Sequence, residues 1–203
     1  MAAAAHVGDA HADHHGPPEA NQSSRVEPAF LGMLLFIISE IMIFGAFFTA
    51  YFFIRVVGGA DWPAEGDHLP KLIAGFNTAI LVSSSFTIHF AQESIRKDNR
   101  LGLQLGMVTT FLLGLTFLFI QVNEYVHIGF SPQDSAQGSI FYGLTGLHGA
   151  HVTIGLMLLA FVTIRSFRGH YSSGHHLGFE VPGIYWHFVD VMWIVVFFTV
   201  YII

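Results

Sequence analysis

The stretch SIFYGLTGLHGAHVTIGLMLLAFVTI, from Ser139 to Ile164, decides the fold class of this chain. It contains no Asp, Glu, Lys, Arg or Pro, and it is longer than the roughly 20 apolar residues that a helix needs to cross a bilayer. Its only acidic or basic side chains are His148 and His151, one helical turn apart. Histidine is costly in lipid, so each ring needs a polar partner or serves a function.

The composition of the whole chain is that of a membrane protein. Of its 203 residues, 53% are hydrophobic, 15% are aromatic and only 11% are charged, and the mean hydropathy is +0.57. The net charge of -6, without a basic patch, argues against a nucleic-acid partner. The absence of cysteine excludes disulfides, thiolate metal sites and iron–sulfur clusters.

Four further segments have the length and apolar character of membrane-spanning helices. They are Phe30–Ile54, Leu72–Ala91, Gly102–Val126 and Gly183–Ile203. We therefore expect an all-α fold, a polytopic integral membrane bundle of five transmembrane helices. Pro28, Pro70 and Pro182 precede three of the starts, where proline is tolerated, and no predicted span has an interior proline.

The first 27 residues differ from the rest, being rich in Ala, His, Asp, Gly and Pro. We expect residues 1–27 to form a disordered His-rich cytoplasmic arm, rather than a cleaved signal peptide, in front of a five-helix domain at 28–203. Five crossings place the termini on opposite sides. The side of the arm would carry Arg25, Arg96, Lys97, Arg100, Arg165 and Arg168, and the other side only Arg55 and Lys71. This bias predicts that the N-terminus lies in the cytoplasm, or in the equivalent compartment, and the C-terminus outside.

Small residues mark the helices that are expected to pack closely. Gly102 and Gly106 form a GxxxG pair. The fourth span carries Gly143, Gly146, Gly149 and Gly155. Such residues allow transmembrane backbones to approach each other, so we expect a tight bundle that docks on other helices.

Polar residues within the predicted spans are candidates for function. They include Glu40, Gln121, Glu124, His148, His151, His187 and Asp190, with His89 near a helix end. Glu124 and His127 form an E-x-x-H, but a di-iron bundle needs two such motifs. A haem bound between His89 and His151 would need both histidines at the same depth in the membrane, but their positions along the spans place them at different depths. Zinc on His148, His151 and a carboxylate would rest on an i, i+3 pair, which is not a site by itself.

A seam of satisfied polar groups is the alternative to a metal site. Glu40 with His148 or His151 would satisfy both partners. His187 and Asp190 could pair within their own helix, and the serines Ser83–Ser85 could bond their own backbone or bridge helices. A role in proton handling also stays open, because buried carboxyl–imidazole pairs can titrate near neutral pH.

Six motifs in the same order resemble subunit III of the haem-copper cytochrome c oxidases, in its short five-helix bacterial form. They are SEIMIFGAFFTAYF (Ser39–Phe52), DWP (Asp61–Pro63), FNT and the following serines (Phe76–Ser85), QVNEY (Gln121–Tyr125), GSIFYGLTGLHGAHVTIG (Gly138–Gly155) and HHLGFEVPGIYWHFVDVMWIVVFFTVYI (His175–Ile202). The resemblance covers Phe30 to the end of the chain. Longer members have two further helices at the front, which form one arm of a lipid-holding cleft.

This resemblance implies an accessory chain without a catalytic residue, metal or cofactor of its own. Haem and copper would lie in the partner subunits I and II. The chain would pack on subunit I, bind phospholipid, sustain proton uptake and protect the active site during turnover. The sequence leaves open whether the complex joins a respiratory supercomplex. Its motif positions, with structural, lipid-facing or proton-related roles, are Glu40, Gln121, Glu124, His148, His151, His175, His176, Glu180, His187 and Asp190. Quinol oxidases and nitric oxide reductases have related accessory chains, which remain as alternatives.

Overall fold

A computed structural model of the chain describes residues 28–57, 69–169 and 177–203. It contains five long helices, which are α1 (Pro28–Phe52), α2 (Lys71–Arg96), α3 (Arg100–His127), α4 (Ala136–Phe167) and α5 (Leu177–Phe197), and two short π-helical turns, η2 (Phe53–Val57) and η3 (Phe198–Ile202). The described residues form no strand. All five helices are long and apolar enough to cross a membrane, as the sequence predicts. The arm at 1–27, the DWP motif, His175 and His176 lie outside the described residues.

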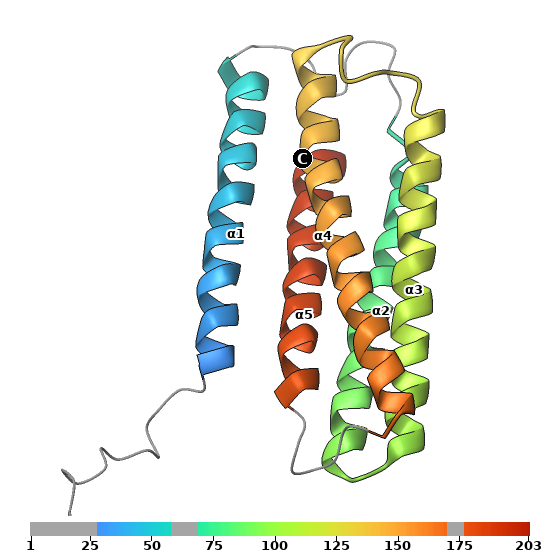
Figure 1. Cartoon of the computed structure of the whole chain (residues 1–203). Helices are drawn as coiled ribbons and strands as arrows, with labels where there is room; N and C mark the ends of the chain where they lie inside the picture. The colour runs from blue at the N-terminus through green and yellow to red at the C-terminus, as the bar shows by residue number, and fades with distance from the viewer. Residues whose placement is uncertain (1–27, 58–68, 170–176) are drawn as a thin grey trace, which may run out of the picture.

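The five helices lie side by side along one bundle axis, so that their termini gather at the two ends of the bundle (Figure 1). The end at which α1 and α5 begin is called the lower end below, and the opposite one the upper end. A short turn around Asp98 joins α2 to α3 at the lower end, where Asp98 adopts a φ of 54°. Helix α1 stands at one side of the bundle, next to α4 and α5 (Figure 1). It buries only Phe44 and Tyr51.

Glycines allow the closest contacts between helices, and four of the six predicted positions, Gly102, Gly106, Gly143 and Gly155, make such contacts. A Cβ on Gly106 would lie 2.8 Å from the Cβ of Ala91, and one on Gly102 would lie 2.5 Å from Ser94 Oγ. Helix α3 therefore packs with its GxxxG face against α2. On α4, a Cβ at Gly155 would meet the ring of Trp186 at 2.9 Å. By contrast, a Cβ added at Gly146 or Gly149 would have no neighbour within 4 Å, so these two glycines make no close helix contact among the described residues.

Pro182 lies inside α5, and the prediction that it precedes the helix is wrong. The helix begins at Leu177, so the proline falls in its second turn. There its missing N–H leaves only the carbonyl of Gly178 without an intrahelical donor, close to the end of the helix. Phe179, which is 1% exposed, packs in the core and fixes the turn before the proline. Pro28 and Pro70 do stand at the starts of α1 and α2.

Candidate functional site

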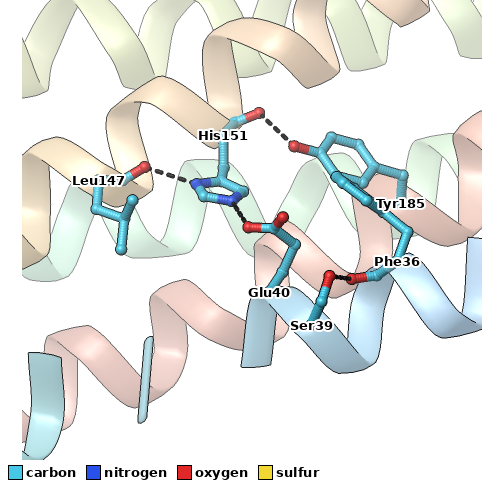
Figure 2. A network of polar contacts seen from close by, with 6 residues as sticks. All are labelled: Phe36, Ser39, Glu40, Leu147, His151 and Tyr185. Carbon is cyan, nitrogen blue, oxygen red and sulfur yellow. Dashed lines mark hydrogen bonds and ion pairs between the residues drawn. The ribbon is translucent and has the colours of Figure 1, made fainter. Parts of the chain in front are cut away.

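A carboxyl–imidazole pair joins α1 to α4 halfway along the bundle. His151 Nε2 lies 2.7 Å from Glu40 Oε2, and His151 Nδ1 lies 2.7 Å from the carbonyl oxygen of Leu147, one turn earlier in α4. Tyr185 on α5 donates to the carbonyl of His151 at 3.3 Å. Figure 2 shows the carboxylate of α1 pointing at the ring between these contacts. Of the two partners predicted for Glu40, the structure selects His151.

The hydrogen bonds of His151 restrict the protons that this pair holds. A backbone carbonyl can only accept, so Nδ1 must carry a hydrogen. The short contact between Nε2 and Glu40 then needs one proton between the two atoms. The pair is either a neutral imidazole with a carboxylic acid or an imidazolium with a carboxylate, and it has no net charge in either form. With side chains only 9% and 13% exposed, His151 and Glu40 thus avoid an uncompensated charge in the membrane.

His148 lies one turn from His151 but in a different environment. Its ring is fully buried and packs between Phe117, with ring centroids 5.8 Å apart, and Trp193, at 4.7 Å. Neither ring nitrogen hydrogen-bonds to another of the described residues. His148 is therefore part of an aromatic cluster, and the two histidines do not converge on a common point.

The QVNEY motif is tied to the C-terminal end of the chain near the upper end of the bundle. Tyr201 donates to Glu124 Oε1 at 2.5 Å, and Gln121, one turn before Glu124, is buried as well. Tyr125 donates to Thr145 on α4 at 2.8 Å. His127, by contrast, contacts the carbonyl of Asn123 in its own helix at 2.8 Å and is exposed. The E-x-x-H residues are thus held by separate partners.

Ser85 on α2 contacts two polar side chains of α5, those of His187 and Asp190. Its hydroxyl donates to Asp190 Oδ2, and its oxygen lies 3.5 Å from His187 Nδ1. The direct pairing of His187 with Asp190 that we expected is thereby replaced by a bridge from the neighbouring helix. The other two serines behave as predicted, because Ser83 bonds the backbone of its own helix and Ser84 bridges to Trp186.

Glu180 is the lowest of the motif positions that the structure describes. It accepts a bond from Arg96 at 3.0 Å, which ties the start of α5 to the end of α2. Both side chains are partly exposed, so this ion pair contributes little to stability by itself. Within the described residues, no three His, Cys, Asp or Glu side chains lie close enough together to hold a metal ion.

Several anchoring residues were missed from the sequence. Trp193 donates to Thr78 and Trp186 to Ser84, each at 2.9 Å. At the upper end, Tyr51 donates to the carbonyl of Thr199 at 2.7 Å, and Arg55 to the hydroxyl of Tyr51 at 2.8 Å. The signal for them was available, because a Trp or Tyr deep in a membrane span needs a partner for its polar group.

Comparison with known proteins agrees with this architecture. The sequence matches the family described as cytochrome c oxidase subunit III over residues 20–203. It is 43% identical over 198 residues to a cytochrome c oxidase subunit 3 of Synechocystis sp., covering 97% of this chain and 81% of that protein. It is 42% identical over 174 residues to that of Thermostichus vulcanus, with 85% and 86% covered, and 41% identical over 176 residues to that of Lumbricus terrestris, with 84% and 68% covered. The chain belongs to the cytochrome c oxidase subunit III family, and it is an accessory membrane subunit of an oxygen-reducing terminal oxidase.

Proposed function

We propose that this subunit binds no haem or metal itself and acts by holding the catalytic subunits in a stable, hydrated and lipid-covered state. The geometry of the two central histidines carries this proposal. Both nitrogens of His151 already have partners, in Glu40 and Leu147, and the ring of His148 is enclosed by Phe117 and Trp193. A ligand histidine would need a free nitrogen aimed at an open space. In this proposal, haem and copper belong to subunits I and II.

The arrangement of α1 supports a role in lipid binding. Its outward side chains are almost all apolar, with Leu35 59% and Met42 71% exposed. Acyl chains satisfy such a surface without any further protein. The chain would pack directly on subunit I, with subunit II in the same complex, bind phospholipid along α1, and sustain proton uptake by keeping the catalytic subunit in its active form. A place in a respiratory supercomplex would follow from the same role.

Basic residues favour the orientation predicted from the sequence. The helix bounds place five basic residues at the lower end, around the end of α2, the start of α3 and the end of α4, namely Arg96, Lys97, Arg100, Arg165 and Arg168. Arg55 in η2 and Lys71 at the start of α2 lie at the upper end. The positive-inside rule then places the lower end and the N-terminus in the cytoplasm of a bacterial cell, and the C-terminus outside. Because the relatives are named for cytochrome c, we favour cytochrome c over quinol as the electron donor of the complex.

Removal of the subunit tests this function. The oxidase purified from cells that lack this chain should keep its haem spectrum and its initial rate of oxygen reduction. Its activity should then decay faster during continuous turnover, and it should contain less phospholipid. Restoring the chain should restore both properties. Loss of the haem spectrum in the depleted enzyme, in proportion to the missing chain, would overturn the proposal, because the chain would then hold part of the cofactor.

A further inference from the structure

A row of polar side chains follows the line along which α2 meets α5, from the lower end to the middle of the bundle. At the lower end it begins with the ion pair of Arg96 and Glu180. One turn higher, the amide of Gln92 lies against Gly183. His89 and His187 come next, and Ser85 with Asp190 ends the row. We call these side chains (Ser85, His89, Gln92, Arg96, Glu180, His187 and Asp190) the polar row.

The upper part of the polar row lies deep within the span. Asp190 follows Glu180 by ten residues, which corresponds to about 15 Å along the helix at about 1.5 Å per residue. A lipid headgroup stays at the surface of the bilayer and does not reach this depth. Water and headgroups can therefore satisfy Arg96 and Glu180, but not the groups around His187 and Asp190.

The polar row opens to the outside of this chain and is only partly satisfied. His89 is exposed, and Ser85 and His187 are half-buried. Within the part of the chain that the structure describes, His89 makes no hydrogen bond, and the only hydrogen-bond contact of His187 joins its Nδ1 to Ser85. Asp190 Oδ1 is buried without a partner among the described residues. Unpaired groups of this kind are costly against hydrocarbon.

The exposed surface of α1 shows what a lipid-facing side looks like in the same molecule. Between Pro28 and Phe52 its only acidic or basic side chain is Glu40, which turns inward to His151; Tyr51 turns inward as well and is buried. The exposed part of α5 near the polar row differs, because the apolar Val191, which is 57% exposed, stands one turn above the half-buried His187. This surface combines an exposed apolar residue with polar groups that lack partners in this chain. A helix of another protein that packs here could cover the apolar residue and hydrogen-bond to the polar groups.

We propose that the α2–α5 face is the docking surface for the catalytic subunit, and that a transmembrane helix of that subunit covers the polar row with hydrogen-bonding side chains at the level of His187 and Asp190. This inference rests on the proposed function, since it names the surface by which the subunit joins its complex. Because Nδ1 of His187 faces Ser85, its Nε2 is the atom available to the partner.

Cross-linking in native membranes tests the docking surface directly. The chain contains no cysteine, so Val191→Cys and Met42→Cys each provide one label site for a benzophenone maleimide. The two positions are matched in depth, since each lies fourteen residues after the first residue of its helix, Leu177 and Pro28. Illumination of the Val191→Cys variant should give an adduct of this chain with the large haem-containing subunit. The Met42→Cys variant should give none.

The outcomes separate this inference from the proposed function. If a haem-copper complex co-purifies but Val191→Cys gives no adduct with its catalytic subunit, or gives only an adduct between two copies of this chain, the docking surface is wrong and the function stands. An equal yield from Met42→Cys would also overturn the docking surface. If no haem protein co-purifies with either variant or with the unchanged chain, the proposed function itself fails.

A second pair of variants tests the polar row without a label. His187→Leu removes the group offered to the partner helix, so the chain should be lost from the complex at lower detergent concentrations than the unchanged chain. His127→Leu, which removes an exposed histidine bonded only within its own helix, should leave this retention unchanged. If His187→Leu leaves retention unchanged or improves it, His187 faces lipid and the proposal is overturned.

Discussion

Helices α1 and α5 are both apolar enough to cross a membrane, but α1 is mostly exposed and α5 is mostly buried in the bundle. Helix α1 buries only Phe44 and Tyr51. Helix α5 contains a proline and three ionisable residues, and its buried side chains include Phe179, Tyr185, Trp186, Phe188, Val189, Asp190, Met192, Trp193 and Val196. The more uniformly apolar helix is the more exposed one. In a membrane, apolar composition therefore indicates contact with lipid, whereas large aromatic and polar residues indicate contact with protein.

The two helices are also held by different forces. Trp186 on α5 fits against Gly114 and Gly155, where added Cβ atoms would lie 2.5 Å and 2.9 Å from its ring. Helix α1 instead depends on polar contacts, with Glu40 at its middle and Tyr51 near its upper end. Truncating a buried side chain of α5 should therefore lower the free energy of unfolding strongly, whereas truncating an outward side chain of α1 should change it little. Removing a polar contact such as that of Glu40 should weaken mainly the attachment of α1 to the bundle.

The largest contrast is expected between Trp186→Ala and Met42→Ala. Trp186 is fully buried, and its truncation should lower the free energy of unfolding by about 3–5 kcal/mol, because it leaves a cavity and removes the hydrogen bond that Trp186 donates to Ser84. Met42, 71% exposed, should change it by less than about 0.5 kcal/mol. Thermal unfolding of the purified protein in detergent measures both. Equal losses would show that α1 is packed against protein as tightly as α5.

Glu40→Ala should have the next largest effect. It leaves the Nε2 of His151 without its partner and should cost about 1–3 kcal/mol. Bound phospholipid and the lifetime of the oxidase during turnover should fall, while the initial rate stays the same. Ser39→Ala is the matched control, because the Ser39 hydroxyl bonds only to the carbonyl of Phe36 in its own helix.

A double variant sharpens this test. Adding His151→Phe to Glu40→Ala removes the second polar partner, so stability should recover in part. If the double variant is as unstable as the sum of the single ones, the two side chains do not interact. If Glu40→Ala changes neither lipid content nor turnover lifetime, α1 is not anchored by this pair.

Gly106→Ala compares the α2–α3 contact with the open face of α1. The new methyl group would meet Ala91 and the backbone of Thr87 at 3.0 Å or less, and overpacking of this kind costs about 1–3 kcal/mol. Gly45→Ala on α1 has no neighbour within 4 Å and should be neutral or slightly stabilising. Thermal unfolding of the two variants in detergent, monitored by circular dichroism, distinguishes them. A stable Gly106→Ala protein would mean that α2 and α3 are less closely packed than described.

The smallest effect is expected for Tyr51→Phe. This change removes the bond to the Thr199 carbonyl and the acceptor of Arg55, at a cost of about 0.5–1.5 kcal/mol. Hydrogen exchange should become faster in η2 and η3, which the hydroxyl connects, and stay unchanged in the α2–α3 turn. Unchanged exchange in η2 would show that the upper end of α1 is held by other contacts.

The sequence predicted the helices better than their partners. All five spans follow from length and apolar character, and the glycines at 102 and 106 indicated a close contact. The start of α5 was predicted too late because proline is common at or just before the first helical position, whereas the helix here begins at Leu177 and contains Pro182, with Phe179 buried before it.

The contacts of the candidate site were predicted only where a buried polar group had very few possible partners. Glu40 needed a partner at its own depth, and two histidines qualified. Which one it contacts depends on the rotation of α4, which periodicity alone does not define within one turn. The bonds from Tyr201 to Glu124 and from Ser85 to Asp190 join residues far apart in the chain. They depend on helix order around the bundle, which no local pattern encodes.

The most direct test of the central claim is the composition of what this chain binds. A tag on the N-terminal end, gentle solubilisation and purification should yield a complex with a haem spectrum and a large catalytic subunit. This chain, once separated from the complex, should carry neither iron nor copper. A chain that purifies alone, or that keeps its own Soret band or stoichiometric metal after separation, would contradict the account and make His148 and His151 ligands.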